Sequence, residues 1–136
     1  VVRLAKMKNF FKNISLLLII IVLFTSKSFS EFNWKKVGEN TSGTVFYVDK
    51  GSVKRIGNTI YFFSMMDYAK PNNGVLSTRI YQEGNCDNYS FRYLKDFYYD
   101  QPMGNGKILQ QIDEVGEWTA NVPGSLNETV FDFLCK

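Results

Sequence analysis

The chain has 136 residues, of which 45% are apolar and 21% charged, with a formal net charge of +3. A chain of this length is sufficient for one domain. It contains no histidine, which excludes the Ser-His-Asp and Cys-His catalytic systems and removes the commonest zinc ligand.

The first thirty residues have the pattern of a secretory signal peptide. Basic residues precede an uncharged apolar run at 14–24, and small residues follow at Ser28 and Ser30, as at a cleavage site. We expect translation to start at Met7 and cleavage to fall before Glu31. The alternative is an uncleaved membrane anchor, which needs about 20 apolar residues, roughly twice this run. The mature chain is therefore predicted to be exported to the periplasm, the medium or the cell surface, without membrane attachment.

Removal of this segment reverses the sign of the net charge. The segment holds five of the 16 basic residues and none of the 13 acidic ones, which leaves eleven against thirteen in residues 31–136, a net of −2. Nucleic-acid binding needs basic residues clustered on the folded part. We therefore expect no nucleic-acid partner.

The first half of the mature chain predicts strands. Residues 32–37 and 44–48 are rich in aromatic and β-branched side chains, which favour strands. Asp49 is expected to cap a helical turn over 50–55. The stretch 59–67 is apolar at both alternating sets of positions, which is typical of a central strand covered on both faces. Pro71-Asn72-Asn73-Gly74 predicts a turn.

Residues 76–99 alternate with a period of two, which predicts a β-hairpin with Cys86 at its tip. A tip at Asn85 and Cys86 pairs Ile80 with Phe91, and on the other face it sets Arg79 opposite Arg92. Like charges directly across a strand pair are unfavourable. The two arginines are therefore expected to share an anionic partner.

The candidate binding residues lie on that second face. Arg79, Tyr81, Arg92 and Tyr98 would together form a Tyr/Arg recognition surface, of the kind found in binding hot spots. The alternative is that this face lies under the C-terminal helix, or that each arginine forms an internal ion pair. Its expected acidic partners are the carboxylates of Asp67, Asp96 and Asp132.

The last third of the chain predicts a loop over 100–116, with one short strand at 107–112, and then a helix. Ser125 and Glu128 form a capping box, and apolar residues follow at helical spacing over 126–135. An amphipathic helix needs a surface on which to bury its apolar stripe. The predicted fold class is α+β, an antiparallel sheet with a C-terminal helix packed on it, in a single domain over 31–136.

The two cysteines, Cys86 and Cys135, are predicted to form one disulfide, because an exported chain meets an oxidising environment. The bond would close a loop of about 50 residues and contribute on the order of 4 kcal/mol in the chain-entropy model. Two buried free thiols are the alternative.

No catalytic residue, metal ligand or cofactor site is predicted. Paired cysteines leave no thiolate for catalysis or metal binding. The acids at 96, 100, 113, 114 and 117 are interpreted as solvated surface carboxylates, which is the usual state of this residue type. The chain is therefore not expected to be an enzyme.

The mature chain resembles the surface-adhesin protein E family of exported bacterial domains. The motifs that carry the resemblance are, in chain order, Trp34-Lys35-Lys36-Val37, Phe46-Tyr47-Val48-Asp49, Ser52-Val53, Arg55 before Gly57, Asp67-Tyr68, Ser77-Thr78-Arg79-Ile80-Tyr81, Gly84-Asn85-Cys86, Phe91-Arg92-Tyr93, Pro102-Met103-Gly104, Trp118, Pro123-Gly124-Ser125 and Cys135. The resemblance implies an antiparallel sheet with a C-terminal helix fastened to it by a Cys86–Cys135 disulfide.

The function that the resemblance implies is adhesion to host extracellular-matrix proteins. The predicted function is therefore an exported, non-enzymatic binding domain with a protein or peptide partner. A periplasmic domain that binds a small ligand or an anion through Arg79 and Arg92 is the alternative. A deep pocket with converging polar groups would favour the alternative, and a flat exposed aromatic surface or an open sheet edge would favour a protein partner.

Overall fold

The computed structural model describes residues 3–4 and 31–136. The predicted signal peptide, except for residues 3 and 4, lies outside the described residues. The chain separates into two units, Val1–Glu31 and Phe32–Lys136, and all the elements below belong to the second unit.

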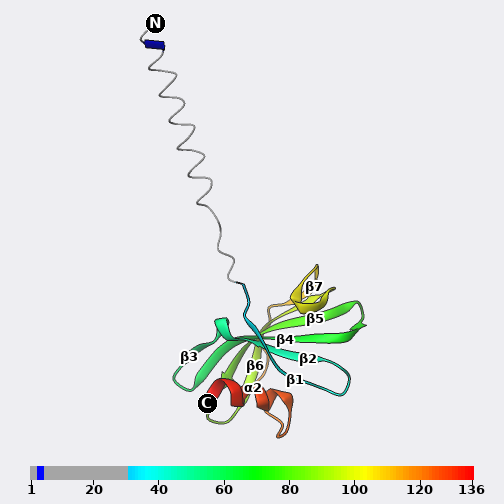
Figure 1. Ribbon diagram of the computed structural model, residues 1–136. Coiled ribbons are helices and arrows are strands. Elements are labelled where there is room, and N and C mark those ends of the chain that lie inside the picture. The colour runs from blue at the N-terminus through cyan, green and yellow to red at the C-terminus, as the bar shows by residue number, and fades with distance from the viewer. Residues whose placement is uncertain (1–2, 5–30) are drawn as a thin grey trace. The chain divides into compact units, whose positions relative to one another are not determined.

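The described residues form one antiparallel sheet and a C-terminal helix (Figure 1). The strand order is β1-β2-β4-β5-β6-β7, while β3 pairs with β4 and β8 pairs with β6. The strands are β1 (Trp34–Glu39), β2 (Val45–Asp49), β3 (Lys54–Ile56), β4 (Thr59–Asn72), β5 (Val75–Asn85), β6 (Ser90–Tyr99), β7 (Ile108–Ile112) and β8 (Thr119–Ala120). Two short 3₁₀ turns, η1 (Lys50–Ser52) and η2 (Pro102–Gly104), precede the helix α2 (Leu126–Cys135). The predicted fold class is confirmed.

Strand β4 is the centre of the sheet. It pairs with β2 and β3 along one side and with β5 along the other, so both of its sides are occupied. Ile60 and Phe62 point to one face and Met65 to the other, and all three are 0% exposed. A strand buried on both faces needs apolar residues at both alternating positions, which is what the sequence predicted for this stretch.

Helix α2 covers one face of the sheet, called here the helix face. Phe131 is fully buried and its ring meets Phe62 edge-on, with 6.2 Å between the centroids. The N-terminus of the helix is capped as predicted, because the Ser125 hydroxyl accepts a hydrogen bond from the Glu128 N–H at 3.2 Å. The Glu128 carboxylate accepts in turn from the Gly124 N–H at 2.7 Å. The cap determines where the helix begins, and the apolar stripe determines which side of the helix is buried.

The disulfide between Cys86 and Cys135 is confirmed. The two residues are 49 positions apart in the chain and their Cα atoms are 5.5 Å apart. Cys86 lies at the tip of the β5–β6 hairpin and Cys135 ends the helix. The bond therefore ties the last turn of α2 to the hairpin on which the helix packs.

The predicted helical turn over 50–55 is wrong in its second half. The Asp49 carboxylate accepts from the Gly51 N–H at 3.0 Å, as expected of a cap, but the turn ends at Ser52. Lys54–Ile56 forms β3 instead and pairs with the start of β4. The cause is the tight connection at Gly57, whose φ of +60° lets the chain fold directly back on itself.

The predicted register of the β5–β6 hairpin is also wrong. Asn85 pairs with Ser90 and Gly84 with Phe91, so the tip holds four residues rather than two. The register then shifts by one residue at Leu94, because Tyr81 pairs with Lys95 while Gln82 pairs with Tyr93. A bulge of this kind reverses which face the following side chains point to. The simple alternation assumed for β6 therefore fails beyond Tyr93.

Loss of the disulfide should destabilise the domain. We expect Cys135→Ser to lower the free energy of unfolding by about 2–5 kcal/mol, the usual range for a small exported domain, as measured by urea denaturation. The Cys86→Ser/Cys135→Ser variant should lose about the same amount as either single variant. Mass spectrometry should show a gain of two hydrogens on reduction. Alkylation of both thiols without a reductant would contradict the bond.

The packing of Phe131 should not tolerate a side chain at position 84. A Cβ at Gly84 would lie 2.6 Å from Phe131 Cζ, so Gly84→Ala is expected to displace the helix and cost about 1–3 kcal/mol of stability by overpacking. At Gly116 the nearest atom is an ordinary 3.6 Å away, and Gly116→Ala serves as the matched control. Urea midpoints check both, and Phe131→Leu should partly rescue Gly84→Ala. Equal midpoints for the two alanine variants would refute the steric argument.

Candidate functional site

The four predicted binding residues do not share one surface. Arg79, Tyr81 and Arg92 lie on the sheet face opposite the helix, because Arg79 and Tyr81 alternate with the helix-face residues of β5 and Arg92 pairs with Glu83. Tyr98 pairs with Thr78 on the helix face. The bulge at Leu94 is the reason, since it moves Tyr98 to the other side of the sheet.

Arg92 forms an internal ion pair, but with none of the predicted partners. Its Nη2 lies 2.7 Å from Glu83 Oε2, directly across the strand pair. The Tyr61 hydroxyl donates to the other carboxylate oxygen at 3.1 Å, and this hydrogen bond raises the pKa of Tyr61. The guanidinium also lies 4.9 Å from the Trp118 ring centroid. Glu83 therefore neutralises Arg92, while Asp67 and Asp132 have other partners, the Met103 N–H and Lys136.

Arg79 lies among aromatic rings instead of acids. Its guanidinium carbon is 4.7 Å from the Phe32 centroid and 4.8 Å from that of Phe97, with Tyr99 and Phe63 slightly farther away. Within residues 31–136 it has no ion pair, and its Nε is buried without a hydrogen-bond partner. Cation–π attraction stabilises such an arrangement. Arg79 and Glu83 are four residues apart along β5, about 13 Å, so the predicted contact between Arg79 and Arg92 is wrong.

Asp96 differs from the solvated acid that was predicted. It is half-buried, and burial raises the pKa of its carboxyl group above the ordinary value. One of its carboxylate oxygens is buried without a hydrogen-bond partner in the described part of the chain. No second acid joins it, and residues 31–136 contain no group of three His, Cys, Asp or Glu side chains placed to hold a metal ion.

The long side of the sheet formed by β7 and β8 exposes apolar side chains. This surface, called here the β7–β8 edge, comprises residues 108–122. Ile108 and Leu109 are 44% and 45% exposed, and Trp118 is 46% exposed. Val115 and Val122 are exposed as well. Strand β7 contains no charged residue and no proline, and it ends the strand order. Its outer side therefore carries no charge that would oppose pairing with another strand, although a bulge at Leu109 interrupts its pairing with β6.

The other long side of the sheet is protected. Strand β1 carries Lys35, Lys36 and Glu39 and is interrupted by a bulge at Val37. The neighbouring β3 contributes Lys54 and Arg55. Charges and bulges are the common means by which proteins prevent edge-to-edge association. Both outer strands carry a bulge, and it is the absence of charge from β7 that marks the β7–β8 edge as the side available to a partner.

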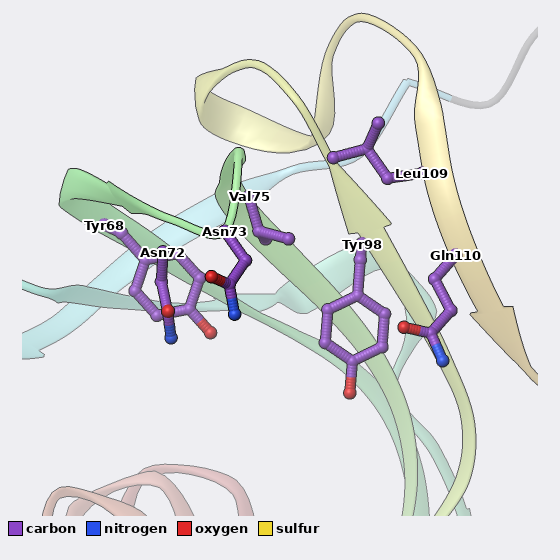
Figure 2. A pocket seen from close by; sticks show the side chains of 7 residues that line it. All are labelled: Tyr68, Asn72, Asn73, Val75, Tyr98, Leu109 and Gln110. Carbon is purple, nitrogen blue, oxygen red and sulfur yellow. The ribbon is translucent and has the colours of Figure 1, made fainter.

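A pocket of about 410 Å³ lies beside β7, between the β4–β5 turn and β6 (Figure 2). Its lining residues are Tyr68, Asn72, Asn73, Val75, Tyr98, Leu109 and Gln110. None of them is charged. Figure 2 shows the Asn73 amide between the two tyrosines and the Gln110 amide on the other side of Tyr98. The volume falls within the range of small-molecule sites, about 300–1,000 Å³.

Sequence reasoning anticipated only parts of these two surfaces. It predicted the turn at 71–74 and the strand at 107–112, and it named Tyr98, but on the wrong face. It missed β8 because a two-residue strand has no detectable periodicity. It missed the pocket because three of the lining residues, Asn72, Asn73 and Val75, lie in or next to the β4–β5 turn, while Leu109 and Gln110 come from a strand more than thirty residues later. The one available signal was the uncharged run of β7.

Comparison with solved structures identifies the fold. Three structures of Haemophilus influenzae protein E are similar to this chain. Crystal form II has a TM-score of 0.53 at 18% identity, over 66% of this chain and 79% of that one. The selenomethionine form has a TM-score of 0.54 at 19% identity, over 66% of this chain and 78% of that one. A third structure has a TM-score of 0.51 at 19% identity, over 76% of this chain and 93% of that one. At such identities the likeness establishes the fold alone.

The sequence has no match among the curated proteins. Among the described residues, no helix is both long and apolar enough to span a bilayer. The family described as surface-adhesin protein E matches residues 34–136, which include every strand of the sheet, the helix α2 and both cysteines. This chain therefore belongs to the surface-adhesin protein E family.

Proposed function

We propose that this protein is an exported, non-enzymatic binding domain that holds a protein or peptide partner at the β7–β8 edge. Family membership supports a binding role of the surface-adhesin kind. The observation that carries the proposal is the uncharged edge strand β7, which exposed apolar side chains accompany. An extended segment of a partner can pair with such an edge through its main chain.

The side chains of the edge supply the apolar part of the contact. Trp118 and Arg92 are stacked at 4.9 Å, and Tyr93, 39% exposed, lies on the adjoining strand. Trp, Tyr and Arg are the residue types that dominate binding hot spots. The exposed apolar side chains are spread along β6, with Ile108 beside Tyr99 and Trp118 beside Arg92, so an extended partner segment could contact them in succession.

The composition of the chain supports a role without catalysis. It contains no histidine, and both cysteines are joined in the disulfide. The remaining candidate with an unusual environment, Asp96, has Tyr93 and Tyr98 as titratable neighbours among the described residues, whereas acid–base catalysis most often uses a histidine. General acid–base and nucleophilic mechanisms therefore lack their usual groups.

The alternative, an anion site built on Arg79 and Arg92, has weaker support. Glu83 already neutralises Arg92 at 2.7 Å, so an added anion would have to displace a paired carboxylate. Arg79 remains a candidate by itself, with Tyr81 on the same face. A role in binding for these two residues stays a prediction.

A charge placed on the edge should weaken partner binding. Ile108→Lys adds a lysine to the outer part of β7, and it should lower affinity at least about tenfold, because a charge at an open edge opposes strand addition. The probes are a panel of immobilised host extracellular-matrix proteins and a phage-displayed peptide library, and surface plasmon resonance measures the binding.

The matched control is Ile56→Lys, since Ile56 is 57% exposed on β3 at the opposite side of the sheet. This variant should bind like the original protein, and both variants should keep the original melting temperature. Equal binding by Ile108→Lys and Ile56→Lys would place the contact elsewhere. Failure of every matrix protein and every peptide to bind would overturn the proposal itself.

Export has its own test. We expect an epitope-tagged protein to leave the cytoplasm and to begin at Glu31 after removal of the signal peptide. Cell fractionation, N-terminal sequencing and protease treatment of intact cells measure the compartment, the cleavage site and the surface exposure. Replacing Ile19 and Ile20 by Asp should block export, because the apolar run is what the export machinery recognises. A tagged protein found only in the cytoplasm would refute this part of the proposal.

A further inference from the structure

The pocket beside β7 has the chemistry of a second binding site, which shares Leu109 and Gln110 with the β7–β8 edge. We propose that it binds a neutral saccharide through side chains, whereas the strand addition proposed for the edge uses the main chain of β7. Three amide side chains line it, those of Asn72, Asn73 and Gln110, together with the rings of Tyr68 and Tyr98. The proposal rests on the kinds of groups present, on their lack of internal partners and on the turn geometry and hydrogen bond that position part of the lining.

The absence of charge from the lining determines the class of ligand. An anionic ligand such as a phosphate or a carboxylate is normally held by Arg or Lys, and a cationic one by Asp or Glu, and the lining contains none of these. Each amide offers two donor hydrogens and an acceptor oxygen. No hydrogen bond joins any of the three amides to another group in the described residues. A ligand rich in hydroxyl groups, which donate and accept in alternation, matches such a lining.

The two tyrosines supply the second feature of a saccharide site. The face of an aromatic ring carries partial negative charge and attracts the positive edges of C–H bonds, which a sugar ring presents on its faces. Tyr98 has no hydrogen-bonding partner for its hydroxyl among the described residues, so the hydroxyl is available to a ligand. Figure 2 shows both tyrosine hydroxyls pointing the same way, with the Asn73 amide between the rings.

The turn geometry and one hydrogen bond position part of this lining, which limits the entropic cost of binding. Asn73 and Gly74 have φ values of +48° and +81°, and Asn72 pairs with Val75 across them. This is the two-residue hairpin turn that Asn-Gly favours. The Tyr68 hydroxyl is 3.0 Å from the hydroxyl oxygen of Thr78, and Thr78 is only 1% exposed. These contacts hold the turn and Tyr68 in place.

The test is a titration of the purified protein, labelled with ¹⁵N, and followed by two-dimensional NMR. The probes are neutral sugars (glucose, galactose, N-acetylglucosamine, lactose and maltose), two charged sugars (glucuronic acid and N-acetylneuraminic acid) and a capped Ser-Gly-Asn peptide. We expect at least one neutral sugar to cause saturable shifts of the backbone amides at 72–75 and 109–110. Each charged sugar should bind more weakly than its neutral counterpart.

Three variants, two at Tyr98 and one at Asn73, locate the binding. Tyr98→Ala removes one ring and should weaken saccharide binding about tenfold, while Tyr98→Phe keeps the ring and should lose only a few-fold. Asn73→Gly removes one amide and keeps the turn, because glycine adopts positive φ readily. Tyr47→Ala is the matched control, since Tyr47 lies on the opposite face of the sheet, across from Met65.

The possible outcomes separate this proposal from the one before it. Ile108→Lys should leave saccharide binding unchanged, because Ile108 is not part of the pocket lining. Shifts caused by the peptide alone, or stronger binding of the charged sugars, would overturn the saccharide assignment. An absence of saturable shifts at 72–75 with every neutral sugar would do the same, whatever the β7–β8 edge binds.

Discussion

The packing of Phe131 against the backbone of Gly84 is the constraint on which the rest of the domain depends. The ring is fully buried and lies where any Cβ at position 84 would stand. Gly84 must therefore be beneath the helix, which places Phe91 opposite it and Arg92 opposite Glu83. The disulfide from Cys86 to Cys135 fixes the same helix to the same hairpin a few residues away. Helix, hairpin tip and register are in this way determined together.

The register in turn decides which charges are internal and which surfaces are free. Glu83 forms an ion pair with Arg92, the arginine that stacks on Trp118. Arg79, four residues before Glu83 on β5, lies instead among aromatic rings, which stabilise its charge by cation–π attraction. The bulge at Leu94 then turns Tyr98 to the helix face. There it meets the β4–β5 turn and forms the uncharged pocket. One extra residue in β6 thus separates the arginine face from the tyrosine pocket.

The two long sides of the sheet differ in charge and in exposed apolar surface. On the side of β1 and β3, lysines and an arginine oppose association, and α2 packs near Gly38 through Leu126. On the side of β7 and β8 the apolar side chains are exposed and the strand is uncharged. An edge left open at the cost of aggregation risk is expected where a partner binds. A domain of the surface-adhesin protein E family can bind in this way without a catalytic group.

Local patterns in the sequence were sufficient for the central strand β4, the capped helix α2, the turn at Asn73 and the cystine, because each depends on neighbouring residues or on a pairing with a single solution. The disulfide had no competitor among two cysteines. Only the tertiary structure decided the register of β5 against β6, the face of Tyr98 and the partner of Arg92. Shifting β5 against β6 by two residues leaves the same side chains on each face, so the alternating pattern does not distinguish the two registers. A bulge adds one residue without changing the composition of the strand, so the sequence does not reveal it. The register was set instead by Phe131, a side chain from the far end of the chain, which requires a glycine beneath it.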